Sequence, residues 1–200
     1  MIKSISFSQD EILQWITELH AGPIELDPCY GKGNFYKKIA KPALRFDLVP
    51  RSPDVIEADL ALGLPVASNS ISTAIFDPPF LIGGSSASLK HLDNPGSNII
   101  HKQYSSFPSA DTLITMYTAS LGELHRVLSP GGHLIVKCQD QISSSRQHWC
   151  HIWVYNMAVK FGFYPLDLFV LLAKSRLMGR GYPQQHARKF HSYFWVFRKP

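Results

Sequence analysis

The sequence predicts an α/β domain built on a mostly parallel sheet with helices on both faces. Short apolar runs alternate with segments of helical periodicity through the first 160 residues, which is the pattern of a parallel sheet. The last two apolar runs, 166–173 and 192–198, have no helix between them, so we expect them to pair antiparallel. A chain of 200 residues fits a single domain, 1–200, with room for a sizeable core.

Five earlier apolar runs bring the predicted sheet to seven strands. They are 23–27, 43–47, 54–62, 72–76 and 133–137. Four further segments are predicted helices, namely 6–20, 35–40, 111–128 and 144–162. The polar segments 81–110 and 174–191 are predicted loops, and a loop as long as the first is usually functional or mobile.

Charge is distributed unevenly along the chain. Residues 141–200 hold nine Lys or Arg and one acid, Asp167, whereas the rest is slightly acidic. Such a segment is either a polyanion-binding surface or a solvated basic face.

Three widely spaced cysteines form neither a disulfide framework nor a metal set, and no signal peptide or membrane span is evident. We therefore expect a cytoplasmic protein with no membrane partner. The sequence does not predict the oligomeric state.

A glycine turn and successive strand-end acids predict a nucleoside site. Asp27 ends the first strand, Gly31 and Gly33 form the following turn, and Asp47 ends the second strand 20 residues after Asp27. At that spacing a second-strand acid reaches a nucleoside ribose. No third glycine is placed to pack a pyrophosphate, so S-adenosylmethionine (SAM) fits better than a dinucleotide. Asp59, near the end of the third run, could accept a hydrogen bond from the adenine amine. A plain turn with capping or solvated acids remains the alternative.

The segment FDPPF at 76–80 ends the fourth strand with a carboxylate, a diproline and an aromatic ring. Prolines remove ladder donors, so the strand must stop at Asp77. Asp77 and the Pro78 carbonyl could accept hydrogen bonds from an exocyclic amine, Pro79 would stiffen this geometry, and Phe80 could stack on a base. The alternative is a strand end followed by a tight turn.

These motifs resemble the amino-directed class I SAM-dependent methyltransferases. DPCYGKGN at 27–34 is similar to their first cofactor motif, FDPPF to their catalytic motif, and LHRVLSPGGHLIVK and HSYFWVFRK to later parts of their fold. The resemblance implies a Rossmann-like sheet with an antiparallel last strand. It implies that the cofactor binds at Asp27, Pro28, Cys29, Tyr30, Gly31, Gly33, Asp47 and Asp59, and that catalysis depends on Asp77, Pro78, Pro79 and Phe80. Cys29 departs from the pattern, where an aromatic residue is common.

The substrate class is less well defined. We expect nucleic acid, with DNA ahead of RNA, because two predicted loops combine basic and aromatic residues suited to phosphate contact and stacking. The candidate substrate-binding residues are Lys102 and Tyr104 in 81–109, and Arg176, Arg180, Arg188 and Lys189 in 174–191. A solvated hairpin loop is the alternative for the second segment.

Three other functions remain open. They are methylation of a protein side-chain amine, binding of SAM or nucleic acid without catalysis, and, more remotely, a nicotinamide-dependent reductase. The segment HWCHIW at 148–153 resembles a metal site only in composition, since its side chains would fan around a helix. We therefore expect no metal, and a helix with Trp149, Ile152 and Trp153 in the core.

Overall fold

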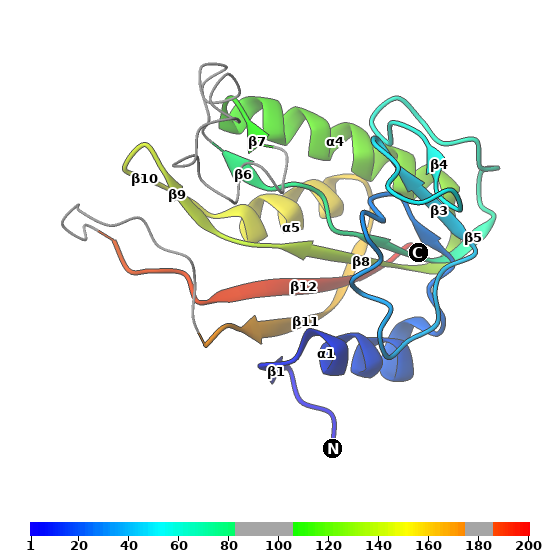
Figure 1. Ribbon diagram of the computed structural model, residues 1–200, viewed down its shortest axis with the longest axis horizontal. Coiled ribbons are helices and arrows are strands. Elements are labelled where there is room, and N and C mark those ends of the chain that lie inside the picture. Colours follow the sequence, from blue (N-terminus) through cyan, green and yellow to red (C-terminus); the bar gives the residue numbers. More distant parts are fainter. Residues whose placement is uncertain (83–105, 175–185) are drawn as a thin grey trace.

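The computed structural model describes residues 1–82, 106–174 and 186–200, and its centre is an eight-stranded sheet (Figure 1). The strand order is β1-β11-β12-β8-β5-β2-β3-β4. In that order the strands are β1 (Ile5–Ser6), β11 (Tyr164–Leu172), β12 (His191–Arg198), β8 (Leu128–Cys138), β5 (Ile71–Phe76), β2 (Leu26–Asp27), β3 (Leu44–Asp47) and β4 (Ile56–Glu57). Two small two-stranded sheets, β6 (Leu81–Ile82) with β7 (Ser106–Phe107) and β9 (Gln141–Ser143) with β10 (Arg146–His148), lie beside it.

The strand directions confirm the predicted sheet. Neighbouring strands run parallel except at β12, which pairs antiparallel with both β11 and β8. The seven predicted strands are all present. The eighth, β1, pairs with β11 through only two residues and was too short for its pattern to stand out in the sequence.

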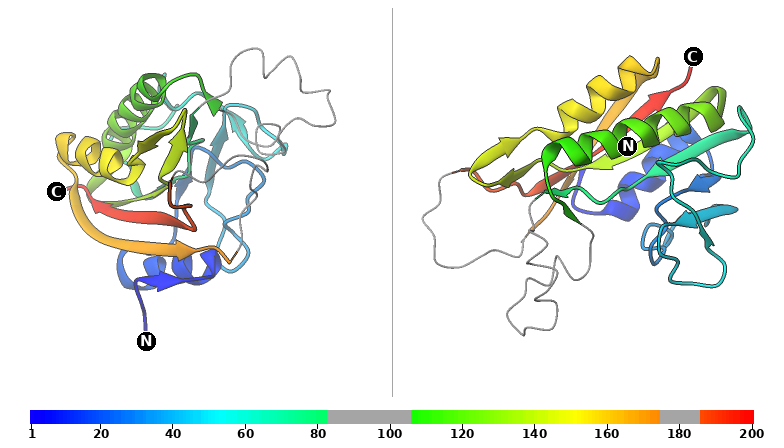
Figure 2. Two further views of the ribbon diagram at one scale, coloured as in Figure 1. Left: turned by 90° about the vertical axis from the view of Figure 1, so that its left-hand side faces the viewer. Right: turned by 90° about the horizontal axis from the view of Figure 1, so that it is seen from above.

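Helices cover both faces of the sheet (Figures 1 and 2). The helices α4 (Ala110–Val127) and α5 (Cys150–Lys160) share one apolar core with one face. On the other face lies α1 (Gln9–Ile16), extended by a π-helical turn, η1 (Thr17–Ala21). Ser8 and Ser109 cap the amino ends of α1 and α4 through their side chains. No helix among the described residues has both the length and the apolarity to cross a membrane.

The predicted helix at 35–40 is wrong, because this segment forms turns. The rings of Tyr30 and Tyr36 stack with centroids 5.4 Å apart, and Phe35 packs into the core beside them. A six-residue segment gains little from helix formation alone, so the burial of its aromatic side chains decides its conformation.

The predicted helix at 144–162 begins later, at Cys150. Ser144 and Ser145 both have positive φ, 49° and 58°, and form the two-residue turn between β9 and β10. The expectation that Trp149 and Ile152 lie in the core is also wrong, since they are 46% and 44% exposed. The apolar residues that this helix buries are Cys150, Val154 and Ala158, with Trp153 partly buried against them.

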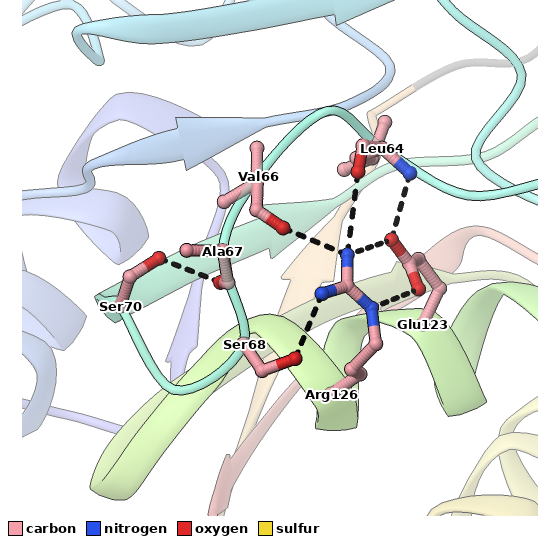
Figure 3. Close-up of polar contacts among 7 residues, drawn as sticks. All are labelled: Leu64, Val66, Ala67, Ser68, Ser70, Glu123 and Arg126. Carbon is pink, nitrogen blue, oxygen red and sulfur yellow. Dashed lines mark hydrogen bonds and ion pairs between the residues drawn. The ribbon is translucent and has the colours of Figure 1, made fainter.

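An ion pair on α4 fixes the chain between β4 and β5 (Figure 3). Arg126 and Glu123 form two contacts, with Nη2–Oε1 at 2.6 Å and Nε–Oε2 at 2.8 Å. The guanidinium also donates to the carbonyls of Leu64 and Val66, and the Leu64 N–H donates to Glu123 Oε1 at 2.7 Å. This connection therefore enters β5 along a fixed path.

Candidate active site

Strand-end side chains gather at the carboxyl edge of the central strands. Leu26 of β2 is in register with Ala74 of β5, and Phe76 is in register with Val136 of β8. Asp27 ends β2, Asp77 directly follows β5 and Lys137 is the next-to-last residue of β8, so the three lie at one edge of the sheet. The strand β3 pairs with β2 on the other side and ends at Asp47. The sequence predicted the acids of this edge, and the strand order brings them together.

Asp27 is almost fully buried, with 2% of its surface exposed. Its Oδ1 accepts from the Cys29 N–H at 2.9 Å and its Oδ2 from the Tyr36 hydroxyl at 2.6 Å. Burial raises the pKa of Asp27 to about 7, and the negative charges of Asp77 and Asp47 add to the rise, whereas the two hydrogen bonds oppose it. Asp27 can therefore gain or lose a proton near neutral pH.

The glycine turn that follows Asp27 is bonded to Asp47. Gly31 has φ of 56° and donates its N–H to Asp47 Oδ2 at 2.7 Å. Asp47 Oδ1 accepts from the Val49 N–H at 2.9 Å. Gly33 has φ of 68°, and a Cβ there would lie 2.6 Å from the Tyr30 hydroxyl. Position 33 therefore requires glycine for two reasons, namely its positive φ and the Tyr30 side chain that occupies the space of a Cβ.

Asp59 follows β4 and accepts from the Ala61 N–H at 2.9 Å, which starts a turn. Burial raises the pKa of the Cys29 thiol, and the charges of Asp27, Asp77, Asp47 and Asp59 raise it further. The thiol thus lies within electrostatic reach of all four strand-end acids. Pro28, between Asp27 and Cys29, is buried.

Asp77 forms an ion pair that the sequence analysis missed. Lys137 Nζ lies 3.3 Å from Asp77 Oδ2, and the two side chains are 18% and 27% exposed. The ammonium also lies 4.8 Å from the centroid of the Phe35 ring. Burial raises the pKa of Asp77, and the Lys137 charge counteracts part of that rise. The sequence contained one signal for this ion pair. Lys137 ends the predicted strand 133–137, just as the acids lie at the ends of their predicted strands.

The residues after Asp77 are held in place by Gln141 of β9. Its Nε2 donates to the carbonyl of Phe80, and its Oε1 accepts from the Ile82 N–H at 2.8 Å. Pro78 is buried, whereas Pro79 and Phe80 are partly exposed. The chain after the diproline is therefore pinned to a strand 61 residues away in sequence. No local pattern marked Gln141 for this role.

A buried carboxylate stabilises the start of α5 beside this segment. The Asp140 side chain has 0% exposure, and its Oδ1 accepts from the His151 backbone N–H at 3.2 Å and lies 2.7 Å from His151 Nδ1. The His151 ring stacks on Tyr193 with centroids 4.4 Å apart. Among the described residues no group of three or more His, Cys, Asp or Glu could hold a metal ion.

The predicted substrate-binding residues are placed only in part. Lys189 Nζ lies 5.0 Å from the centroid of the Trp149 ring, and Arg188 is exposed next to it. Both lie in the segment that leads into β12. The other four, Lys102, Tyr104, Arg176 and Arg180, lie outside the described residues.

Comparisons with known proteins identify the fold. No protein-family model and no curated protein matches the chain. A SAM-dependent methyltransferase of Thermotoga maritima, described as a possible histamine N-methyltransferase, matches with a TM-score of 0.57 and 15% identity over 97% of this chain and 90% of its own. The [4+2]-cyclase SpnF matches with a TM-score of 0.54 and 16% identity over 96% of this chain and 80% of its own.

TTHA0409 of Thermus thermophilus, provisionally described as a DNA modification methylase, matches with a TM-score of 0.48 and 17% identity over 72% of this chain. The chain spans about half of the length of TTHA0409, since the match covers 52% of it. The matches that span more than 90% of this chain confirm the predicted Rossmann-like class I methyltransferase sheet, with eight strands in place of seven. At such low identity the likeness is one of fold.

Proposed function

We propose that the protein is a SAM-dependent methyltransferase that transfers a methyl group to an exocyclic amine of a nucleobase in nucleic acid. DNA is the favoured substrate, at adenine N6 or cytosine N4, and RNA is the alternative. The observation that carries the proposal is the position of Asp77. Its carboxylate ends a central strand, a diproline and an aromatic residue follow it, and the acids of the glycine turn lie at the same edge.

The residues of this edge suit the chemistry of amine methylation. The lone pair of a nucleobase amine is delocalised into the ring, so the nitrogen is a poor nucleophile. Asp77 and the Pro78 carbonyl would accept hydrogen bonds from the two N–H groups of the amine. These hydrogen bonds would localise the lone pair on the nitrogen. The Lys137 side chain, 3.3 Å from Asp77 Oδ2, opposes the rise in the pKa of Asp77 that burial causes and so favours the ionised, accepting form. Because Gln141 pins the chain after the diproline, these acceptors are held in position before the substrate binds.

The glycine turn and its acids fit the cofactor. When bound, SAM would supply an electrophilic methyl group on its sulfonium. Each oxygen of Asp47 accepts one backbone N–H and keeps a second lone pair, which could accept a ribose hydroxyl. Asp27 would hold the cationic amine of the amino-acid end, and Asp59 the adenine amine. The turn can approach a ligand closely because Gly31 and Gly33 have no side chains.

The fold comparison supports methyl transfer without deciding it. Structures with the same fold that cover more than 90% of this chain include SAM-dependent methyltransferases from Thermotoga maritima and Methanosarcina mazei. The cyclase SpnF has the fold too, so fold alone does not define the reaction. The strand-end residues therefore carry the assignment.

The test supplies the purified protein with SAM carrying a labelled methyl group and with pools of DNA, RNA or protein. We expect label in nucleic acid, most strongly in DNA, and none in protein. Label in protein alone would identify a side-chain amine as the acceptor and overturn the nucleobase assignment. Absence of SAM binding by calorimetry would overturn methyl transfer altogether.

A further inference from the structure

A basic and aromatic surface spans the β9–β10 hairpin, the start of α5 and the segment that leads into β12. It consists of Arg146, Trp149, Arg188 and Lys189, and we call it the Trp149 surface. Trp149 is 46% exposed although it begins a helix that packs on the sheet. Lys189 Nζ lies 5.0 Å from the centroid of its ring, and Arg146 and Arg188 are exposed.

Two contacts hold the surface together. His186 Nε2 lies 3.1 Å from the Ser145 carbonyl, which joins the segment before β12 to the β9–β10 turn. Trp149 lies edge-on to the His151 ring at 6.2 Å, and Asp140 holds that ring by Nδ1 at 2.7 Å. One edge of Trp149 therefore packs against the His151 ring, while nearly half of its surface faces solvent.

The hairpin that carries Arg146 is bonded to the residues after the diproline. The β9–β10 hairpin that presents Arg146 begins at Gln141, which bonds the carbonyl of Phe80 and the N–H of Ile82. Figure 1 shows β6, β9 and β10 at the same end of the molecule. A polymer whose target base lies against Phe80 would extend over this hairpin.

The part of the sequence that carries this surface contains few acids. Residues 141–200 contain one acid, Asp167, and its Oδ2 lies 2.9 Å from His20 Nε2 on the other face of the sheet. Asp140, the acid directly before the β9–β10 hairpin, is fully buried against His151. A lysine ammonium at the face of an exposed indole ring, with two exposed arginines on the same segments, is complementary to a phosphate backbone with unstacked bases.

We propose that the Trp149 surface binds the single-stranded nucleotides that flank the target base. Lys189, Arg146 and Arg188 contact phosphates, and Trp149 stacks on a neighbouring base. A base that enters an active site must leave its stack, so its neighbours expose the faces that such a ring can cover. The inference rests on the proposed function, because it takes nucleic acid as the substrate.

The chain offers a matched control at the opposite end of the sheet. Tyr164 is 53% exposed, and Arg198 Cζ lies 5.6 Å from the centroid of its ring. This pair is in register between β11 and β12, at the end of β12 away from His191. It has the same chemistry as Trp149 with Lys189 but lies far from the diproline segment.

The test measures the binding of a short fluorescent single-stranded DNA by anisotropy over a range of salt concentrations. Trp149→Ala should weaken binding roughly tenfold or more, the loss of one stacked base. Lys189→Gln should weaken binding and reduce the slope of log affinity against log salt by about one. Tyr164→Ala and Arg198→Gln should match the wild type. SAM titration and thermal melting verify that each variant is folded.

Two outcomes separate this inference from the proposed function. If the wild type methylates nucleic acid and Trp149→Ala and Lys189→Gln bind and methylate as it does, the Trp149 surface is not the binding site. A loss of equal size in the Tyr164 and Arg198 variants would have the same meaning. If the wild type neither binds nor methylates nucleic acid but methylates another acceptor, the proposed function itself fails.

Discussion

The ammonium of Lys137 lies 3.3 Å from the Asp77 carboxylate, at the ends of two neighbouring parallel strands. The Phe35 and Phe194 rings lie 4.8 and 5.8 Å from the same ammonium. Asp77 therefore faces a positive charge that aromatic side chains hold in place. Lys137 thus counteracts part of the rise in pKa that burial causes at Asp77, the residue that we assign to amine polarisation.

Removal of the Lys137 charge should change the pH dependence of methyl transfer. In Lys137→Met the pKa of Asp77 should rise, because burial remains and the opposing charge is lost. The acidic limb of the profile of kcat against pH should then move to higher pH. At a pH below the pKa, the ionised fraction of Asp77 falls about tenfold when the pKa rises by about one. Lys137→Arg should keep the wild-type profile, and an unchanged profile in Lys137→Met would contradict the assigned role.

Asp27 should make the protein less stable as pH rises toward neutrality. Its pKa is about 7 in the folded protein and 3.8 ordinarily, so between these values the unfolded state binds fewer protons and the free energy of unfolding falls. Asp27→Asn should make this decline shallower, by up to about 4 kcal/mol across the window. Denaturant unfolding at a series of pH values measures it. Asp111→Asn, at an exposed residue of α4, should keep the wild-type decline, and identical slopes in both variants would be inconsistent with a raised pKa at Asp27.

The two glycines of the turn should differ in their tolerance of alanine. Gly31→Ala should cost about 1–2 kcal/mol in the free energy of unfolding, the strain of a positive φ, because a Cβ there meets only the Cys29 carbonyl at 4.0 Å. Gly33→Ala should cost more, because its Cβ would lie 2.6 Å from the hydroxyl of Tyr30, whose ring is stacked on Tyr36. Equal losses in denaturant unfolding would argue against this packing.

Gln141 should support catalysis without contacting the cofactor. Gln141→Leu leaves the Phe80 carbonyl and the Ile82 N–H without their partner, so kcat should fall while SAM affinity stays near the wild-type value. Gln147→Leu is the control, because Gln147 bonds the Gln141 and His148 carbonyls within the same hairpin. Calorimetry and steady-state kinetics measure the two effects, and an equal kcat loss in the control would assign it to the hairpin as a whole.

Much of the fold and the acids of the site could be predicted from local patterns. The runs that end at Asp27 and Asp47, and the run before Asp77, became neighbouring strands because parallel strands present their carboxyl ends at one edge. The helix at 111–128 was predicted by its apolar spacing and is confirmed as α4. These features depend on short stretches of chain, which a sequence shows directly.

What the sequence did not reveal depends on contacts between distant segments. Lys137 meets Asp77 because of the register of β5 with β8, and Gln141 reaches Phe80 across 61 residues. The segment 35–40 forms turns because Phe35 and Tyr36 find partners elsewhere in the core. In each case tertiary packing determines the contact or the conformation, and local propensity does not encode tertiary packing.

The role of Asp77 is tested most directly by mass spectrometry of nucleosides from cells that express the wild type or Asp77→Ala. We expect N-methylated adenine or cytosine with the wild type and none with the variant, while calorimetry shows SAM binding to both. Asp111→Ala should behave as the wild type. Methylated base at the wild-type level with Asp77→Ala, or methyl groups only on ring carbons, would contradict polarisation of an exocyclic amine by Asp77.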